Sequence, residues 1–364
     1  MKEIVYFLTR KATTKEESGV YSDNEDVDLY LQIGRRLSAG VNADRTRLVE
    51  SILPIRVKHT IGIAALHSSI SFADAADYRA TEIIQNLEKE DKEIYLMWSG
   101  GIDSTTMLAA LLKNSNLAQR QRFNILLSDH SIIENKDFFF NHIIGKLKYS
   151  SSRNIYNSLK DKTVILMSAD CSDQLVGGPY NIYPAEFWQQ PPTLENLSKI
   201  YNNKYSETLF TDRLMPVADA WNEIHVKTAT TCNVELKTIL QWWRWNTINF
   251  VFTRKFYQFY EFGKGKFTID TFYRSSKLDQ WALGDLVAAP GQPKIYKYDL
   301  KKYIFDFDHN EDYFINKQKK GSAPAIAKTN IKRCLIDEDF NTLDPKHFMD
   351  YYQQNNFITQ ALNI

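Results

Sequence analysis

The stretch IYLMWSGGIDSTTMLAALLKNS, residues 94–115, decides the fold class because two kinds of apolar pattern meet in it. Its first five residues are apolar without interruption, which is typical of a strand buried on both faces of a parallel sheet. Beyond two glycines, Met107, Leu108, Leu111 and Leu112 recur at helical spacing. A buried strand that turns sharply into a helix predicts one unit of an α/β fold.

The same alternation of strands and helices extends along the chain. Short apolar strands are expected at Phe123–Ser128 and Thr163–Ser168, with a helix, Asp137–Leu147, between them. Beyond Tyr180 no strand is expected, and the aromatic stretch 236–265 predicts one or two helices. This alternation predicts a parallel sheet with right-handed crossovers, whose ligands bind beyond the carboxyl ends of the strands.

Composition divides the chain into three consecutive parts. Residues 1–70 are expected to form a small region of uncertain fold, with short strands at Glu3–Thr9 and His59–Leu66. Residues 71–235 carry the alternating pattern and are predicted to form the α/β core. Residues 236–364, rich in aromatic side chains, predict a mostly helical part that completes this core.

Bulk properties argue against several classes of protein. The formal net charge of the 364 residues is +1, so nothing global attracts nucleic acid or an anionic membrane. No apolar stretch has the length of a membrane-spanning helix, and the N-terminus lacks the pattern of a signal peptide, so a cytoplasmic protein is expected. The three cysteines form no Cys-x-x-Cys pair, which argues against a disulfide framework and a zinc site.

The loop Ser99–Ser104 has the features of an anion site. Gly100 and Gly101 allow a sharp turn and a close approach of the backbone to a ligand. The amides that open the following helix carry the positive end of its dipole, and serine hydroxyls add donors. Asp103 would repel phosphate unless a divalent cation lies between them, because Mg²⁺ binds carboxylate and phosphate oxygens together. The alternative is a strand–helix turn in which these side chains only cap the helix.

A second loop with carboxylates follows the third expected strand, in ILMSADCSDQLVGGPY, residues 165–180. Asp170 and Asp173 lie in this loop, and two glycines follow them. If the third strand lies near the first, these carboxylates reach the same sheet edge as the first loop. Asp103 and Asp173 could then share a metal ion, whereas the alternative is an aspartate-rich loop with helix caps.

Together these loops resemble the N-type ATP pyrophosphatases, also called PP-loop enzymes. Ser99–Ser104 is similar to their pyrophosphate loop, and SADCSDQLVGG, residues 168–178, is similar to the second motif in the synthetase domain of asparagine synthetases and β-lactam synthetases. Two further segments, Tyr273–Leu283 and Tyr298–Pro324, are similar to later motifs of that family, in the same order. The resemblance spans about residues 75–330 and implies an α/β fold of the adenine nucleotide alpha hydrolase-like type.

The resemblance implies an ATP-dependent carbon–nitrogen ligase. ATP adenylates a small-molecule or peptide carboxylate with release of pyrophosphate, and an amine or ammonia then displaces AMP. By position, Asp103 and Asp173 would hold Mg²⁺. Asp170 would orient or deprotonate the amine, and Lys319 would stabilise charge at the acyl centre. The nucleotide-binding residues expected are Ser99, Gly100, Gly101, Asp103, Ser104 and Ser128.

Some residues depart from the family pattern. Lys2 stands where glutamine-using asparagine synthetases have a catalytic cysteine, and the region before the core is too short for a glutaminase. Glutamine hydrolysis is therefore not expected. Cys171, Gln174 and Pro179 replace the family's usual residues, which leaves open whether asparagine is the product.

Two other functions stay open. One is a PP-loop enzyme that modifies a nucleobase or tRNA, although no nucleic-acid partner is expected, because the aromatic and basic stretch Trp242–Tyr260 predicts a packed helix. The other is a degenerate relative that binds nucleotide or only a partner protein. The acyl and amine substrates, the source of ammonia, the pathway, the oligomeric state and the role of residues 1–70 are not determined by the sequence.

Overall fold

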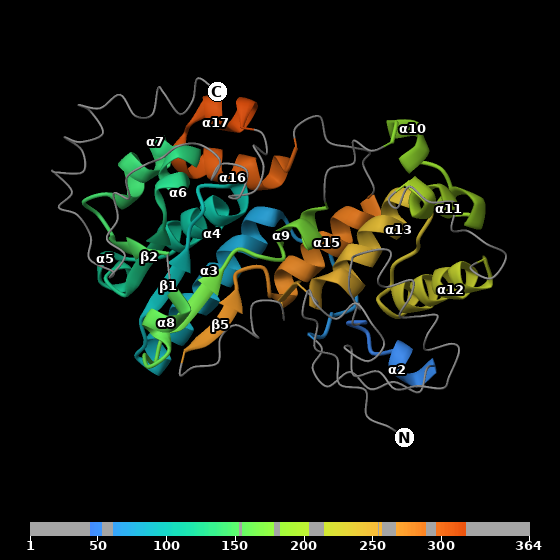
Figure 1. Ribbon diagram of the computed structural model, residues 1–364, viewed down its shortest axis with the longest axis horizontal. Helices are drawn as coiled ribbons and strands as arrows, with labels where there is room; N and C mark the ends of the chain where they lie inside the picture. The colour runs from blue at the N-terminus through green and yellow to red at the C-terminus, as the bar shows by residue number, and fades with distance from the viewer. Residues whose placement is uncertain are drawn as a thin grey trace. The chain divides into compact units, whose positions relative to one another are not determined.

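The computed structural model describes most of the residues between 44 and 317. The described residues are 44–52, 61–152, 155–177, 183–203, 215–253, 255–256, 267–288 and 296–317. The chain divides into two compact units, each built from separate stretches (Figure 1). Unit 1 comprises Met1–Ser71, Cys171–Glu261 and Tyr273–Pro293, and unit 2 comprises Phe72–Asp170, Phe262–Phe272 and Lys294–Ile364. The division into 1–70, 71–235 and 236–364 concerns consecutive parts of the sequence and stays a prediction.

Unit 2 contains a five-stranded sheet, which confirms the predicted α/β class. Its strands are β1 (Ile94–Met97), β2 (Phe123–Leu127), β3 (Lys148–Ser151), β4 (Ile165–Ser168) and β5 (Thr268–Thr271). All pairs are parallel, in the order β3-β2-β1-β4-β5. The central strand β1 is buried apart from its last residue, as predicted for a strand covered on both faces.

The strand order creates a switch point between β1 and β4. From β1 the chain adds β2 and then β3 on one side, and it returns to add β4 and β5 on the other. Leu96 pairs with Ile125 of β2 and with Met167 of β4, so the three strands end at nearly the same level. In open parallel sheets, the crevice at such a reversal is the usual place for a ligand.

Two strands of the sheet, β3 and β5, are not predicted from the sequence, and one predicted strand does not form in its described residues. Both β3 and β5 lie at the edges of the sheet, and their polar sequences, KYSS and TIDT, lack the apolar run of a central strand. Of the expected strand His59–Leu66, residues 61–66 pair with no strand, and only the Leu66 amide donates to the Cys232 carbonyl oxygen, at 2.9 Å. The expected strand Glu3–Thr9 lies outside the described residues.

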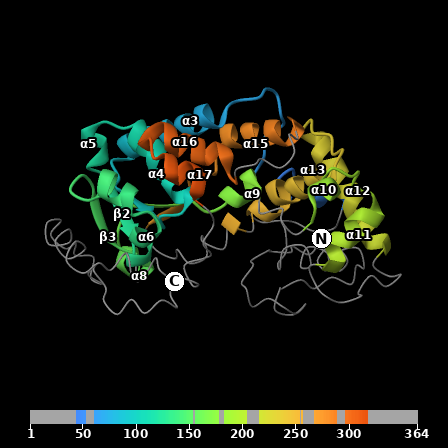
Figure 2. The ribbon, with the colours of Figure 1, turned by 90° about the horizontal axis from the view of Figure 1, so that it is seen from above.

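The other described elements of unit 2 are helices. Their bounds are α3 (Phe72–Glu90), α4 (Ile102–Lys113), α5 (Leu117–Arg120), α6 (Asp129–Glu134), α7 (Lys136–Phe138), the π-helix η1 (Phe139–Ile143), α8 (Ile155–Leu159), α16 (Tyr298–Asp308) and α17 (Glu311–Asn316). Of these, α3, α4 and α16 pack against one another (Figure 1 and Figure 2). The expected helix Asp137–Leu147 corresponds to α7 and η1 and ends earlier, before the turn that leads into β3.

One carboxylate joins the three packed helices. Asp77 of α3 accepts hydrogen bonds from Lys113 at 2.6 Å, from Asn114 at 2.8 Å and from the Tyr303 hydroxyl. Burial acts to raise the pKa of Asp77, but these donors hold it below its ordinary value. Since Tyr303 belongs to α16, this contact fixes the middle of that helix against α3 and α4.

A histidine–aspartate contact holds the far end of α16. His142 Nε2 lies 2.5 Å from Asp308 Oδ1, and the Asp308 side chain is buried. The His142 ring also packs against Phe138 and Phe307, with ring centroids 4.7 and 4.9 Å away. The helix α16 is therefore held in place at two points, by Tyr303 against α3 and by Asp308 against η1.

Unit 1 is formed by helices around an aromatic core. Its described helices are α2 (Val49–Ile52), α9 (Ser172–Val176), α10 (Ala185–Trp188), α11 (Leu194–Asn203), α12 (Met215–Thr231), α13 (Ile239–Trp245), the π-helix η2 (Asn246–Val251) and α15 (Ser276–Ala288). Trp221, Trp242, Trp245 and Phe250 are fully buried. The predicted helical character of the aromatic stretch is thus confirmed in α13 and η2. No described helix of either unit is long and apolar enough to cross a membrane.

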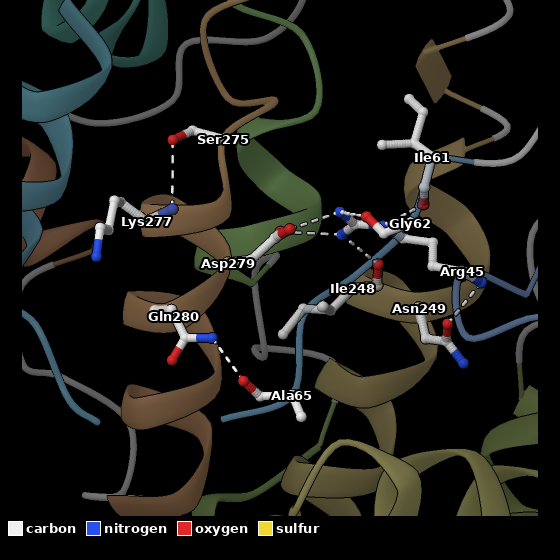
Figure 3. A network of polar contacts seen from close by, with 10 residues as sticks. All are labelled: Arg45, Ile61, Gly62, Ala65, Ile248, Asn249, Ser275, Lys277, Asp279 and Gln280. Atoms are coloured by element: carbon white, nitrogen blue, oxygen red, sulfur yellow. Dashed lines mark hydrogen bonds and ion pairs between the residues drawn. The ribbon is translucent and has the colours of Figure 1, made fainter. Parts of the chain in front are cut away.

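A buried ion pair joins Arg45 to α15 (Figure 3). Arg45 donates two hydrogen bonds to Asp279, of 3.0 and 2.8 Å, and its guanidinium lies 4.2 Å from the ring centroid of Phe252. Its remaining N–H groups donate to backbone carbonyl oxygens, so the guanidinium has no donor unused. Burial raises the pKa of Asp279, and the charge of Arg45 opposes that rise.

Replacing Arg45 by methionine should destabilise the protein strongly, because Asp279 would be left buried without its counter-charge. The expected cost is about 3–5 kcal/mol, measured as the free energy of unfolding in urea. The double variant Arg45→Met with Asp279→Leu should recover much of this loss, since no buried charge then remains. Arg47→Met, at an exposed position, is the control. Equal stability of Arg45→Met and wild type would contradict the role of this pair.

His225 of α12 is enclosed in the aromatic core of unit 1. Its ring stacks on Trp242 with ring centroids 4.3 Å apart, and Nδ1 lies 2.9 Å from the Trp221 carbonyl oxygen. Burial lowers the pKa of His225 from 6.5 to about 4. The folded protein therefore holds this ring neutral at pH values where the unfolded chain protonates it.

His225 should consequently make stability depend on pH in one window. Its contribution is complete above pH 6.5 and is lost as the pH falls toward 4, because only the unfolded chain binds the proton there. The loss should reach about 2 kcal/mol at pH 5, measured as the change in unfolding free energy from pH 7.5. The variant His225→Phe should lack this component, whereas His67→Gln, at an exposed position, should keep it. Identical pH profiles for wild type and His225→Phe would contradict the assignment.

Candidate functional site

The residues expected to bind nucleotide gather at the carboxyl edge of the sheet. Ser99 follows β1 and Ser128 follows β2, and the pairing of Met97 with Leu126 puts both serines at the same level of adjacent strands. Asp170 follows β4, which pairs directly with β1. The expectation that the third predicted strand lies beside the first is therefore confirmed, and the two loops leave the sheet next to each other.

Gly100 lets the backbone of the loop press against α6. Its φ is +75°, a left-handed conformation that side chains with a Cβ rarely adopt. A Cβ at this position would lie 2.2 Å from the Ser131 carbonyl oxygen and 2.8 Å from Glu134 Cβ. The position therefore requires glycine for two separate reasons, backbone conformation and lack of space.

Replacing Gly100 by alanine should cost more stability than the same change at Gly145. Both glycines have a left-handed φ, but a Cβ at Gly145 would meet nothing within 4 Å. Gly145→Ala should therefore show only the conformational cost, about 1–2 kcal/mol, whereas Gly100→Ala adds the clash with α6. Urea unfolding of the two variants gives the comparison. Equal losses would mean that the loop is not held against α6.

Hydroxyl groups hold the loop in shape. Ser104 Oγ accepts from the Ser99 amide at 3.1 Å, lies 3.0 Å from Ser99 Oγ and donates to the Gly101 carbonyl oxygen at 3.2 Å. Gly101 is the N-cap of α4 and offers no side-chain cap to the helix. The first amides of α4 also have no partner within the helix, so their dipoles favour an anion there.

Asp103 forms an ion pair with Lys297, a residue that the sequence interpretation does not include. Lys297 Nζ lies 2.5 Å from Asp103 Oδ1. The Lys297 side chain is only 3% exposed, whereas that of Asp103 is 31% exposed. Lys297 immediately precedes α16, so the packing of that helix on α4 brings the cation to the loop.

A second lysine, at the end of α17, contacts α6 next to the loop. Lys317 Nζ donates to the Glu134 carbonyl oxygen at 2.8 Å and also to the Glu134 carboxylate. Both side chains are largely buried, and Glu134 is one of the α6 residues against which Gly100 packs. Tyr313 is buried in the same cluster, and burial, together with the charges of Asp103 and Glu134, raises the pKa of its hydroxyl. Lys319, expected to act at the acyl centre, lies outside the described residues.

The two aspartates of the second loop belong to different units. Asp170 is the last residue before the boundary in unit 2, where its carbonyl oxygen accepts a hydrogen bond from the Thr271 hydroxyl. Asp173 lies on α9 in unit 1, after Cys171, which starts that helix with a left-handed φ of 73°. The structure thus places Asp170 at the same sheet edge as Asp103, while a metal site shared by Asp103 and Asp173 stays a prediction.

Asp103 is the described carboxylate that best fits a magnesium ligand at this edge. It lies in the loop itself and is partly exposed, and Mg²⁺ commonly takes one or two carboxylates together with substrate phosphates. Within the described residues, no three histidine, cysteine or acidic side chains cluster as a metal site would require. Any Mg²⁺ at Asp103 would compete with Lys297 for the same carboxylate.

Comparison with known proteins gives no family for this chain. The sequence matches no protein-family model and no curated protein at a significant level. Its function is therefore inferred from the geometry of the loops and from their motifs.

Proposed function

We propose that the chain is an asparagine synthetase-like ligase that uses ATP to form an amide and releases AMP and pyrophosphate. The observation that carries this proposal is the loop Ser99–Ser104, which opens α4 at the switch point between β1 and β4. Backbone amides, a buried lysine and a partly exposed carboxylate meet at that loop. Such a combination suits a phosphate chain with a divalent cation better than it suits a simple turn.

In the proposed reaction, a substrate carboxylate oxygen attacks the α-phosphorus of ATP and the bond to pyrophosphate breaks. The amides of α4 and Lys297 would stabilise the negative charge that develops on the leaving pyrophosphate. An amine or ammonia then attacks the acyl carbon, loses a proton and displaces AMP. Asp170, at the neighbouring strand end, is the proposed acceptor of that proton, and Lys319 the proposed cation at the acyl centre. Mg²⁺, held at Asp103 and Asp173, would neutralise phosphate charge when bound.

Two observations support this proposal: the motifs that resemble those of PP-loop enzymes, and the order of the strands, which brings the two loops together. A cytoplasmic location is part of the proposal. The acyl donor is proposed to be a small-molecule or peptide carboxylate, and asparagine is only one candidate product. The aromatic and basic stretch that begins at Trp242 gives no support for a nucleic-acid substrate, because Trp242 and Trp245 are fully buried and Arg244 pairs with Asp285. Those side chains are not available to stack on bases.

The proposed activity is tested by incubating the full chain with ATP, Mg²⁺ and a panel of carboxylates. Ammonia is one acceptor, and hydroxylamine, which traps acyl-adenylates as hydroxamates, is another. We expect AMP and pyrophosphate in equal amounts with at least one carboxylate. Formation of ADP instead, or no turnover with any carboxylate, would contradict the proposal.

The variant Lys297→Met should lower kcat/KM for AMP formation by about 100-fold or more, because the charge on the leaving pyrophosphate loses a preorganised cation. Lys146→Met, at an exposed turn of the same unit, is the matched control and should behave as wild type. Full activity of Lys297→Met would remove this lysine from the mechanism.

A further inference from the structure

Two buried hydroxyl groups hold the backbone of Asp170, the proposed proton acceptor. The Asp170 amide donates to Ser168 Oγ at 3.3 Å, and the Thr271 hydroxyl donates to the Asp170 carbonyl oxygen. Ser168 and Thr271 are only 3% and 1% exposed. The N–H and the C=O of Asp170 are therefore both engaged by side chains that belong to the sheet.

The register of the sheet places these two hydroxyl groups side by side. Ser168 is the last residue of β4 and Thr271 the last of β5, and the two residues are partners in the parallel pairing of these strands. Residues that pair in register project from the same face of a sheet. The chain at Asp170, two positions after β4, therefore meets both groups at once.

Arg79 of α3 fixes the end of β5 in turn. Its guanidinium donates to the carbonyl oxygens of Thr271 and Phe272, at 3.0 and 3.1 Å, and to the Asp270 carboxylate at 2.9 Å. Arg79 is buried, so water competes little for these donors. Since β5 is an edge strand that pairs with β4 on one side, the arginine gives it a second attachment and keeps Thr271 in place.

Placement of a proton acceptor requires a fixed backbone. In the proposed second step, the amine nitrogen bonds to the acyl carbon, the bond from that carbon to the AMP oxygen breaks, and one amine proton passes to the Asp170 carboxylate. The acceptor must lie within hydrogen-bond reach of that proton, and a misplacement of about 1 Å can cost about 100-fold in rate. With its N–H and C=O both engaged, Asp170 moves its carboxylate chiefly through the torsions of its own side chain.

We propose that Thr271 is a positioning residue for this proton transfer, because its hydroxyl holds the backbone of Asp170 and thereby directs the carboxylate to the attacking amine. The inference rests on the proposed function and deepens it, since it gives a role to a strand that the sequence motifs leave out. Thr271 acts only through Asp170. It therefore affects the second half of the reaction, amide formation, and not the adenylation that precedes it.

The test compares the two half-reactions in the variant Thr271→Val, which removes the hydroxyl and keeps the shape of the side chain. Adenylation is measured as exchange of labelled pyrophosphate into ATP with a carboxylate that wild type accepts, and amide formation as kcat with saturating ammonia. Thr271→Val should lower kcat for amide formation about tenfold or more and leave the pyrophosphate exchange within about twofold of wild type. KM for the carboxylate should not change. Thr271→Ser, which keeps the hydroxyl, should recover most of the lost rate.

Backbone hydrogen exchange, followed by mass spectrometry, gives a readout that needs no turnover. Segment 165–176 should exchange faster in Thr271→Val than in wild type, whereas Thr271→Ser should resemble wild type. Segment 94–113, which contains β1 and α4, should be unchanged in both variants and shows that they are folded. Thr268→Val is the matched control, because Thr268 lies on the same strand, at its exposed first position, and this variant should match wild type in every measurement.

The outcomes separate this inference from the proposed function. If Thr271→Val loses both half-reactions equally, or neither, Thr271 is a structural residue and the inference is wrong while the proposed function stands. Unchanged hydrogen exchange of segment 165–176 in that variant overturns the inference in the same way. If hydrogen exchange is faster but wild type forms no AMP with any carboxylate, the proposed function is wrong. The hydroxyl then holds the loop without positioning a proton acceptor, and the inference is overturned with the function.

Discussion

The parallel pairing of β4 with β1 is the constraint on which the rest of unit 2 depends. Because β2 and β3 occupy the other side of β1, the loops after β1 and β4 leave the sheet as neighbours. The tight turn at Gly100 then directs the chain into α4, with the loop held against α6. The helix α16 packs on α4 and brings Lys297 to Asp103, in the first turn of α4. Sheet order therefore determines which charges surround the loop.

The sequence predicts those parts of the fold whose pattern is local. The apolar run Ile94–Trp98 and the helical spacing after it lie in one short stretch, and both β1 and α4 form there. The edge strands β3 and β5 cannot be predicted from such a pattern, because a strand with one unpaired side needs no continuous apolar run. Their Lys, Ser, Thr and Asp residues pair only because a neighbouring strand is already in place.

The candidate site likewise contains residues that a local motif predicts and residues that only the packing of distant helices brings in. Ser99–Ser104 can be recognised because glycine, hydroxyl and carboxylate residues occur within a few positions. Lys297 cannot, because a lysine in a sequence is typical of exposed surface, and here helix packing buries it. Arg45 of unit 1 is a similar case: nothing in its sequence neighbourhood indicates a partner 234 positions away. Long-range ion pairs of this kind carry no local signal.

The distance in sequence between the loop and its lysines also determines the order in which they appear during synthesis. Lys297 lies 194 positions after Asp103, so ribosomes complete the loop, α4 and α6 well before α16 exists. A nascent chain at that stage presents Asp103 and Glu134 beside the loop before Lys297 and Lys317 can pair with them. Docking of α16 and α17 then gives each of these carboxylates a lysine partner. Under the proposed function, a prematurely terminated chain that lacks α16 and α17 would present the loop with both carboxylates unpaired.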